Sequence, residues 1–199
     1  DLLLFTDADC VPDPDWVEAM ARIFEDPTVA AVKGVYRSGQ DGLTSRFAQV
    51  EFEDRYELLD RAGATDMVDT HCAGFRAELF RRCGGFDERF PVANNEDTDL
   101  SYRLAAGGHR LVFSRSAGVR HLRHPGTPWE YWRLKFRRGY WRAAIYRRFP
   151  RKVLHETYTP SGLKLQVLAL GMLILGAGLA CFAPAAGLAL AVTAAGLLA

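Results

Sequence analysis

Residues 2–9 read Leu2-Leu3-Leu4-Phe5-Thr6-Asp7-Ala8-Asp9, and they carry the most information about the architecture. The stretch begins as a short continuous apolar run, which is typical of a buried central strand. It ends directly in two carboxylates, one residue apart. In open α/β sheets, ligands bind beyond the carboxyl ends of the strands. We therefore expect Asp7 and Asp9 to lie at the rim of a binding cleft.

Strand-like and helix-like segments alternate along the following residues. Further strands are expected at Val29–Val35, Val68–Thr70 and Arg110–Ser114, and helices at residues 13–25, 45–61, 76–83 and 97–106. This alternation predicts an α/β domain with a largely parallel sheet. The 199 residues are enough for one such domain and a short appendage.

The overall composition restricts the function only weakly. The 24 acidic and 25 basic residues nearly cancel, so the net charge indicates no class of partner. The four cysteines have no CxxC spacing, which argues against a disulfide framework or a zinc site and favours a reducing compartment. Asp1 leads straight into an apolar strand, and the apolar run after Pro184 is short for a membrane span. We therefore expect the sequence to be truncated at both ends.

The DxD spacing occurs more than once, so its context decides its meaning. It is found at Asp7/Asp9, Asp13/Asp15 and Asp97/Asp99. Capping of a helix start explains Asp13/Asp15. Two carboxylates that follow an apolar strand can instead hold a Mg²⁺ or Mn²⁺ ion that also binds diphosphate oxygens. The alternative for Asp7/Asp9 is a solvated turn that happens to contain two acids.

The same stretch also fits a different enzyme class. Asp7-Ala8-Asp9-Cys10-Val11 matches the DxDx[TV] motif of haloacid-dehalogenase-like phosphatases, in which Asp7 would be the nucleophile and Asp9 the general acid/base. Those enzymes need a second acidic cluster after an apolar strand. Here the later cluster follows the polar pair Asn94-Asn95 and opens a helix, which disfavours this alternative. A non-catalytic membrane protein that retains the fold is a further alternative.

The second acidic cluster is Glu96-Asp97-Thr98-Asp99. Asp97 would lie at a helix N-terminus, where the helix dipole stabilises a carboxylate. A rigidly held, ionised carboxylate near an acceptor hydroxyl is what a general base requires. An acidic helix cap is the alternative.

Three motifs taken in order resemble glycosyltransferase family 2. They are Thr6-Asp7-Ala8-Asp9-Cys10, Cys83-Gly84-Gly85-Phe86-Asp87-Glu88-Arg89-Phe90, and Asn95-Glu96-Asp97-Thr98-Asp99-Leu100 with Arg103-Leu104. Roughly ninety residues separate the two acidic motifs, and the resemblance extends from about Asp1 to His124. It implies a partial A-type glycosyltransferase (nucleotide-diphospho-sugar transferase) fold, in which the family's amino-terminal, base-binding half has no counterpart.

The resemblance also implies roles for individual residues. Asp7 and Asp9 would bind Mg²⁺ or Mn²⁺ and the donor diphosphate, Asp97 would be the catalytic base, and Glu96 would help to bind the acceptor. His121 matches a family histidine that reaches back to the metal, and His124 is a nearby rival for that role. The implied reaction is inverting transfer of a sugar from a nucleotide-diphospho-sugar to a hydroxyl of a glycan or lipid-linked acceptor.

The carboxyl-terminal third has the pattern of a membrane anchor. Residues 133–152 contain nine basic residues interleaved with aromatic ones and no acid, and no charge occurs from Val167 onward. A nucleic-acid surface fits this order less well than an amphipathic segment at an anionic lipid surface. We predict a catalytic part at 1–128, an interfacial segment at 129–161 and a transmembrane helical hairpin at 162–199. The positive-inside rule places the catalytic domain on the cytoplasmic side of the plasma (inner) membrane.

Overall fold

The computed structural model describes residues 1–90 and 94–198. The chain divides into two compact units, Asp1–Tyr158 and Thr159–Ala199. The first contains a sheet with its helices, and the second contains two apolar helices. The α/β architecture expected from the sequence is confirmed.

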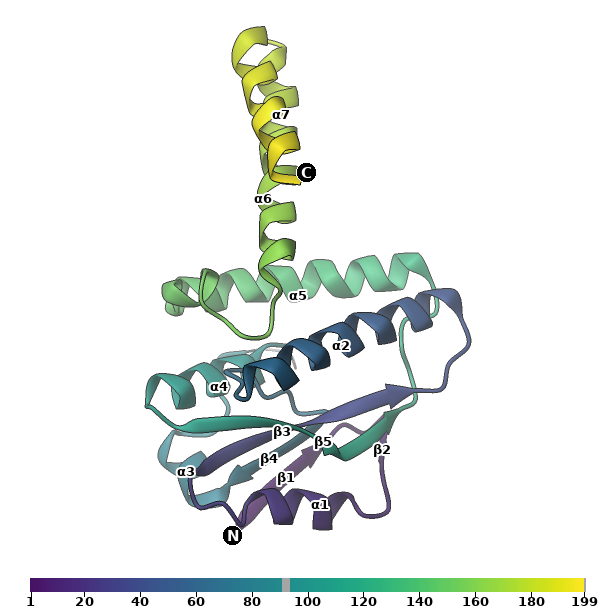
Figure 1. The fold of residues 1–199 in the computed structure, drawn as a ribbon, viewed down its shortest axis with the longest axis vertical. Coiled ribbons are helices and arrows are strands. Elements are labelled where there is room, and N and C mark those ends of the chain that lie inside the picture. Colours follow the sequence, from purple (N-terminus) through teal and green to yellow (C-terminus); the bar gives the residue numbers. More distant parts are fainter. Residues whose placement is uncertain (91–93, 199) are drawn as a thin grey trace. The chain divides into compact units, whose positions relative to one another are not determined.

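The first unit is built on a five-stranded sheet with the order β1-β4-β3-β5-β2. In Figure 1, α1 lies on one face of this sheet, and α2 and α4 lie on the other. The strands are β1 (Leu2–Thr6), β2 (Cys10–Pro12), β3 (Val29–Ser38), β4 (Cys72–Arg76) and β5 (Arg110–His121). The helices are α1 (Trp16–Ile23), α2 (Leu43–Ala62), α3 (Ala77–Arg82), α4 (Glu96–Ala106), α5 (Pro128–Arg148) and the short 3₁₀ helix η1 (Pro150–Val153).

The sheet is mixed, so the prediction of a largely parallel sheet is wrong. Among the described strands, only β3 and β5 pair in parallel; the pairs β1–β4, β3–β4 and β2–β5 are antiparallel. The cause is the route of the chain after α2. This helix ends near the start of β5, where the Thr65 N–H donates to the Leu111 carbonyl at 3.1 Å. Residues 65–71 then run toward the end of the sheet at which β3 and β5 finish. Strand β4 starts from that side and runs antiparallel to β3.

Two local predictions also need correction. Val68–Thr70 does not form a strand, because the N–H and the carbonyl of Val68 bond to the Ser101 hydroxyl of α4 at 2.9 and 3.2 Å. Within the described residues, β1 is an edge strand and not a central one. Its continuous apolar run is accounted for by contacts on both faces, since Leu2 and Leu4 pack against one core cluster and Phe5 against another.

The core lies on both sides of the sheet. One cluster joins Met20 of α1 and Phe24, the residue after this helix, to strand residues. The other joins Leu100 and Leu104 of α4 to Phe75 of β4. Complete burial of a side chain such as Met20 stabilises the fold by about 1.5–3 kcal/mol. These contacts fix the sheet edge that carries the polar residues described below.

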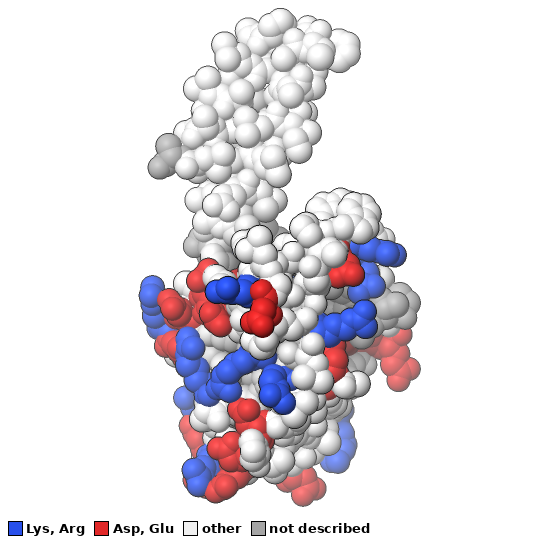
Figure 2. All heavy atoms as spheres, turned by 90° about the vertical axis from the view of Figure 1, so that its right-hand side faces the viewer, with Lys and Arg blue, Asp and Glu red and all other residues white. Residues whose placement is uncertain are grey.

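The second unit consists of α6 (Ser161–Ala180) and α7 (Pro184–Leu198). The two helices pack closely, because the backbone at Gly187 approaches Gly176 and Ala180. Residues Gly162–Ala180 are long and apolar enough to cross a membrane, with a mean hydropathy of 1.9, whereas α7 is shorter. Among the described residues, Figure 2 shows no charged side chain on the visible face of this unit, while acidic and basic residues intersperse on the first unit. A helical pair is therefore present, and its insertion into a membrane stays a prediction.

Candidate active site

Polar residues gather at the edge where β1, β3 and β5 end and where β2 and β4 begin. Asp7 follows β1, Asp9 directly precedes β2, His71 directly precedes β4, and His121 is the last residue of β5. Since these strands pair side by side, residues far apart in sequence lie together. This is the edge at which the sequence predicted a cleft.

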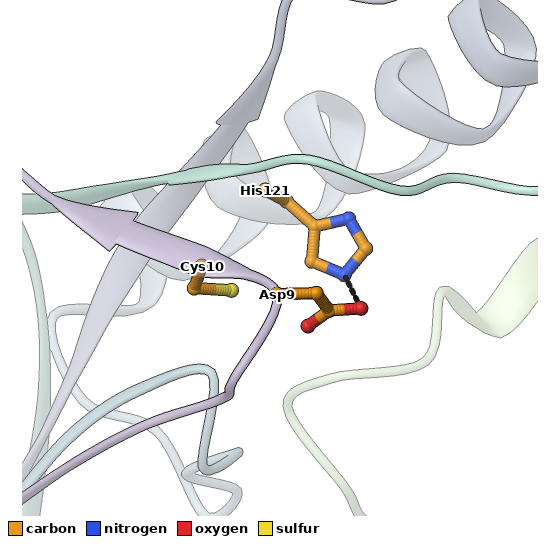
Figure 3. A group of neighbouring side chains, drawn as sticks. All are labelled: Asp9, Cys10 and His121. Carbon is orange, nitrogen blue, oxygen red and sulfur yellow. Dashed lines mark ion pairs between the residues drawn. The ribbon is translucent and has the colours of Figure 1, made fainter.

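Asp9 and His121 face each other across the β2–β5 pair. Cys10 is the cross-strand partner of His121, and the Leu122 N–H donates to the Asp9 carbonyl at 2.8 Å. The His121 imidazole then points toward the Asp9 carboxylate, with Nε2 3.6 Å from Oδ2 (Figure 3). The structure therefore brings together two of the three residues expected to bind the metal.

Cys10 completes a group of three potential ligands whose atoms lie within 4.8 Å of one another. Burial, together with the nearby charges of Asp7 and Asp9, raises the pKa of the Cys10 thiol to about 11. It is a thiol at neutral pH, whereas the thiolate is the ligand form. Mg²⁺ and Mn²⁺ prefer oxygen ligands over sulfur, so Asp9 and His121 are the better donors of this group.

The two histidines at the end of β5 have different partners. Burial lowers the pKa of His121, and the Asp9 carboxylate offsets this only in part, so the neutral imidazole that can bind a metal is favoured. Burial and neighbouring histidines lower the pKa of His124 to about 4. The ring of His124 lies 3.3 Å from the Gln49 amide oxygen, and no described carboxylate pairs with it. Of the two rivals, His121 is the one beside Asp9.

Asp7 has a histidine partner of its own. Nε2 of His71 lies 3.5 Å from Oδ2 of Asp7, and the Thr70 hydroxyl donates to Oδ1 at 3.4 Å. The His71 ring is stacked on Tyr36, with 5.1 Å between ring centroids and 20° between planes. Asp7 is therefore held from the segment that leads into β4.

The acidic turn predicted to supply the base forms the start of α4. Asp97 accepts the Thr98 N–H at 2.6 Å. Burial raises the pKa of Asp97, and the charge of Asp69 raises it further, while His71 opposes these effects. Burial, followed by the charges of Asp97 and Asp7, raises the pKa of Glu96. The start of α4 thus lies within electrostatic range of the residues around Asp7.

A cavity of about 210 Å³ opens at this edge. Its walls contain Asp7, Asp9, His71 and His121, whereas Glu96 and Asp97 are not among them. Helix α5 and the segment before it supply further lining residues, namely Arg123, His124, Pro125, Tyr131, Leu134, Lys135 and Arg138. The side-chain amide of Asn95 donates to the Arg138 carbonyl at 3.4 Å, which joins α5 to the start of α4.

Several of these residues were not predicted from the sequence. His71 is a single histidine on an irregular segment and belongs to no recognisable motif. Lys33 lies behind the site, where it pairs with Asp69 next to His71. Its sequence signal is clearer, because a lysine within the apolar run Val29–Val35 must find a charged partner if the strand is buried. The lining residues of α5 lie in the segment interpreted as interfacial, where basic and aromatic residues are also expected at a lipid surface.

The motifs and the fold agree with one sequence family. The profile of the family described as "Glycosyltransferase like family 2" matches residues 1–140. The chain belongs to this family. The resemblance seen in the motifs around Asp7 and Asp97 is thereby confirmed.

Individual relatives match part of this chain. A pre-mycofactocin glycosyltransferase of Mycobacterium tuberculosis is 30% identical over 127 residues, which covers 61% of this chain and 27% of the relative. The O-antigen biosynthesis protein RfbC of Myxococcus xanthus is 32% identical over 139 residues, 61% of this chain and 11% of the relative. The chain thus spans about a quarter or less of these relatives. The structure of a Pyrobaculum calidifontis mannosyltransferase matches 99% of this chain and 60% of its own, with 20% identity and a TM-score of 0.49.

Proposed function

We propose that this chain is the catalytic part of a metal-dependent, inverting glycosyltransferase, which moves a sugar from a nucleotide-diphospho-sugar to an acceptor hydroxyl. The observation that carries the proposal is the meeting of Asp7 and Asp9 with His71 and His121 in one cavity wall, in a chain of family 2. Glycosyltransferase names among the relatives support the reaction class. The phosphatase alternative has no such support.

The residues at the sheet edge fit a divalent cation. Asp7, Asp9 and His121 offer carboxylate oxygens and a neutral imidazole, a donor set suited to Mn²⁺ or Mg²⁺. Both aspartates are partly exposed, so a ligand can reach them. A cation bound here supplies charge neutralisation for the leaving diphosphate.

Basic residues of the cavity suit the donor's phosphates. Arg123 and Arg138 line the cavity, and no acid in the described part of the chain forms an ion pair with either. Lys135 is different, because its ammonium pairs with Glu51 at 2.6 Å. The two guanidinium groups can form charge-assisted hydrogen bonds with a diphosphate.

Asp97 is proposed as the general base and Glu96 as an acceptor-binding residue. A carboxylate with a raised pKa accepts a proton from a hydroxyl more readily than an ordinary one. The pKa of Asp97 is raised by burial and by Asp69. Asp97 would take the proton of the acceptor hydroxyl while the oxygen attacks the anomeric carbon in line.

The rest of the chain supports a proposal for the acceptor class and the location. Exposed aromatic residues line one face of α5, and Trp129, Trp132 and Phe136 stack in sequence. Together with the apolar helix α6, they support attachment to a membrane. The basic residues within 133–152 favour the cytoplasmic face of the plasma membrane. A lipid-linked or cell-envelope glycan is the acceptor class that fits this location.

Donor hydrolysis by the full-length protein tests the proposal. The protein is supplied with a panel of nucleotide-diphospho-sugars, and release of nucleoside diphosphate is measured with Mn²⁺ and with a chelator. We expect metal-dependent release that Asp9→Asn abolishes. Asp15→Asn, which changes an exposed aspartate of the second DxD, is the matched control and should leave release unchanged. Release that persists in Asp9→Asn, or a phosphoaspartate trapped at Asp7, would contradict the proposal.

A further inference from the structure

A buried ion pair lies behind the wall of the cavity. Lys33 of β3 is completely buried, and its ammonium donates to Oδ2 of Asp69, whose side chain is 5% exposed. Burial lowers the pKa of Lys33, but the charge of Asp69, the hydrogen bond to it and the nearby Tyr158 and Asp97 together more than offset this, so the pKa lies above its ordinary value. An isolated buried charge is very costly, so each of these groups requires the other.

The pair leaves one carboxylate oxygen directed at His71. Oδ1 of Asp69 is buried without a hydrogen-bond partner among the described residues, and so is Nδ1 of His71. These two atoms lie 3.9 Å apart. On its other side, the same ring presents Nε2 to Asp7 at 3.5 Å. Lys33, Asp69, His71 and Asp7 therefore form one chain from the core to the cavity.

We propose that His71 is a positioning residue, which holds the Asp7 carboxylate in place for the divalent cation and is itself held by the buried Lys33–Asp69 pair. This inference rests on the proposed metal site. His71 acts on Asp7 and is not itself assigned as a metal ligand, because its two ring nitrogens face the carboxylates of Asp7 and Asp69. The site then has two matched pairs, Asp7 with His71 and Asp9 with His121.

The physical reason is the freedom of Asp7. It follows the last residue of β1 and its side chain is 38% exposed, so the strand alone does not fix its rotamer. Stacking on Tyr36 fixes the plane of the His71 ring, and the Asp69 carboxylate lies 3.9 Å from its Nδ1. Groups that orient a metal-binding carboxylate or imidazole in this way typically contribute about 10–100-fold to metal affinity.

Three variants of the full-length protein test this role through Mn²⁺ affinity, measured by electron paramagnetic resonance without any donor. His71→Phe keeps a ring against Tyr36 but removes both nitrogens. His71→Gln restores an N–H donor near Asp7. His109→Phe, at an exposed histidine before β5, is the control for the substitution itself.

We expect His71→Phe to weaken Mn²⁺ binding by about 10–100-fold, His71→Gln to recover most of the loss, and His109→Phe to bind as the wild type does. The melting temperature is recorded for each variant, because a purely structural histidine would change it without changing Mn²⁺ affinity. Wild-type affinity in His71→Phe, or an equal loss in His71→Gln, would overturn the positioning role alone. A wild-type protein that binds no Mn²⁺, or binds it equally after Asp9→Asn, would overturn the proposed metal site and this inference with it.

Discussion

Replacement of Asp97 by asparagine separates donor binding from transfer. Oδ1 of Asp97 accepts the Thr98 N–H at 2.6 Å and lies 3.3 Å from the Thr98 hydroxyl, and no hydrogen bond to Oδ2 is present in the described part of the chain. An asparagine keeps the size of the side chain and can still accept the Thr98 N–H. It cannot accept a proton from an acceptor hydroxyl. The substitution therefore removes the base with little change to the start of α4.

Loss of a general base typically lowers the rate by about 10²–10⁴-fold, which corresponds to about 2.7–5.4 kcal/mol in the barrier. We expect kcat for transfer to fall by this amount in the full-length enzyme, while metal-dependent donor binding, followed by calorimetry, stays unchanged. Glu88→Gln, which changes an exposed acid between α3 and α4, should alter neither quantity.

The pH dependence gives an independent check on Asp97. Burial, and then the charge of Asp69, raises the pKa of Asp97, and the base form is the deprotonated one. Wild-type kcat should therefore rise with pH through a value above the ordinary aspartate pKa of about 3.9, and Asp97→Asn should lack this limb. If Asp97→Asn instead loses donor binding and keeps its transfer rate per bound donor, Asp97 is a binding residue and the reasoning is refuted.

Three further outcomes are expected, two from the packing of the core and one from the apolar helix α6. A Cβ atom at Gly34 of β3 would lie 2.3 Å from Sγ of Cys72, so Gly34→Ala should lower the free energy of unfolding by about 1–3 kcal/mol. Gly39 has open space around it, so Gly39→Ala should not lower this free energy. Denaturant titration measures both variants. Lys33→Met should lower the free energy of unfolding by about 3–5 kcal/mol, because it leaves the Asp69 charge buried without a partner. The double variant Lys33→Met/Asp69→Leu should recover most of this loss. A double variant no more stable than Lys33→Met would contradict the mutual dependence of the two charges. Deletion of residues 162–199 should release most of the protein from membranes, and any protein that stays bound should be released by high salt. Fractionation at low and high salt measures this. Tight binding at high salt in a chain without another span would show that α6 is not the anchor.

Elements with strong local signals could be predicted from the sequence. The strand at Val29–Val35 appears within β3, and the helices at 45–61 and 97–106 appear as α2 and α4. The direction of β4 could not be predicted, because it depends on the course of residues 65–71 along the sheet. That course is stabilised by bonds from Val68 to Ser101, which lies far away in sequence. Local periodicity contains no information about such a contact.

The residues of the candidate site also differ in whether the sequence alone could predict them. Asp7 and Asp9 were predictable, because two acids directly after an apolar strand are expected at the ligand-binding edge of a sheet. His121 was identified through a family motif and lies beside Asp9 in the structure. His71 had no such signal, since its relation to Asp7 depends on where β4 begins. A lysine within a buried apolar strand requires a charged partner, and only the fold shows that this partner is Asp69.

The position of the proposed metal-binding groups depends on strand register more than on motif spacing. Cys10 pairs with His121 in the short β2–β5 ladder, and this register sets the Asp9 carboxylate against the imidazole. A shift of one residue would turn every side chain of a strand to the opposite face. The β2 strand has only three residues, so its register is held by few bonds, among them the 2.8 Å bond from the Leu122 N–H to the Asp9 carbonyl. On the other side of the site, Asp7 depends on the ladder between Thr6 and Cys72 in the same way. The two carboxylates are thus close in sequence but are placed by different strand pairs, which explains why each has a separate histidine beside it.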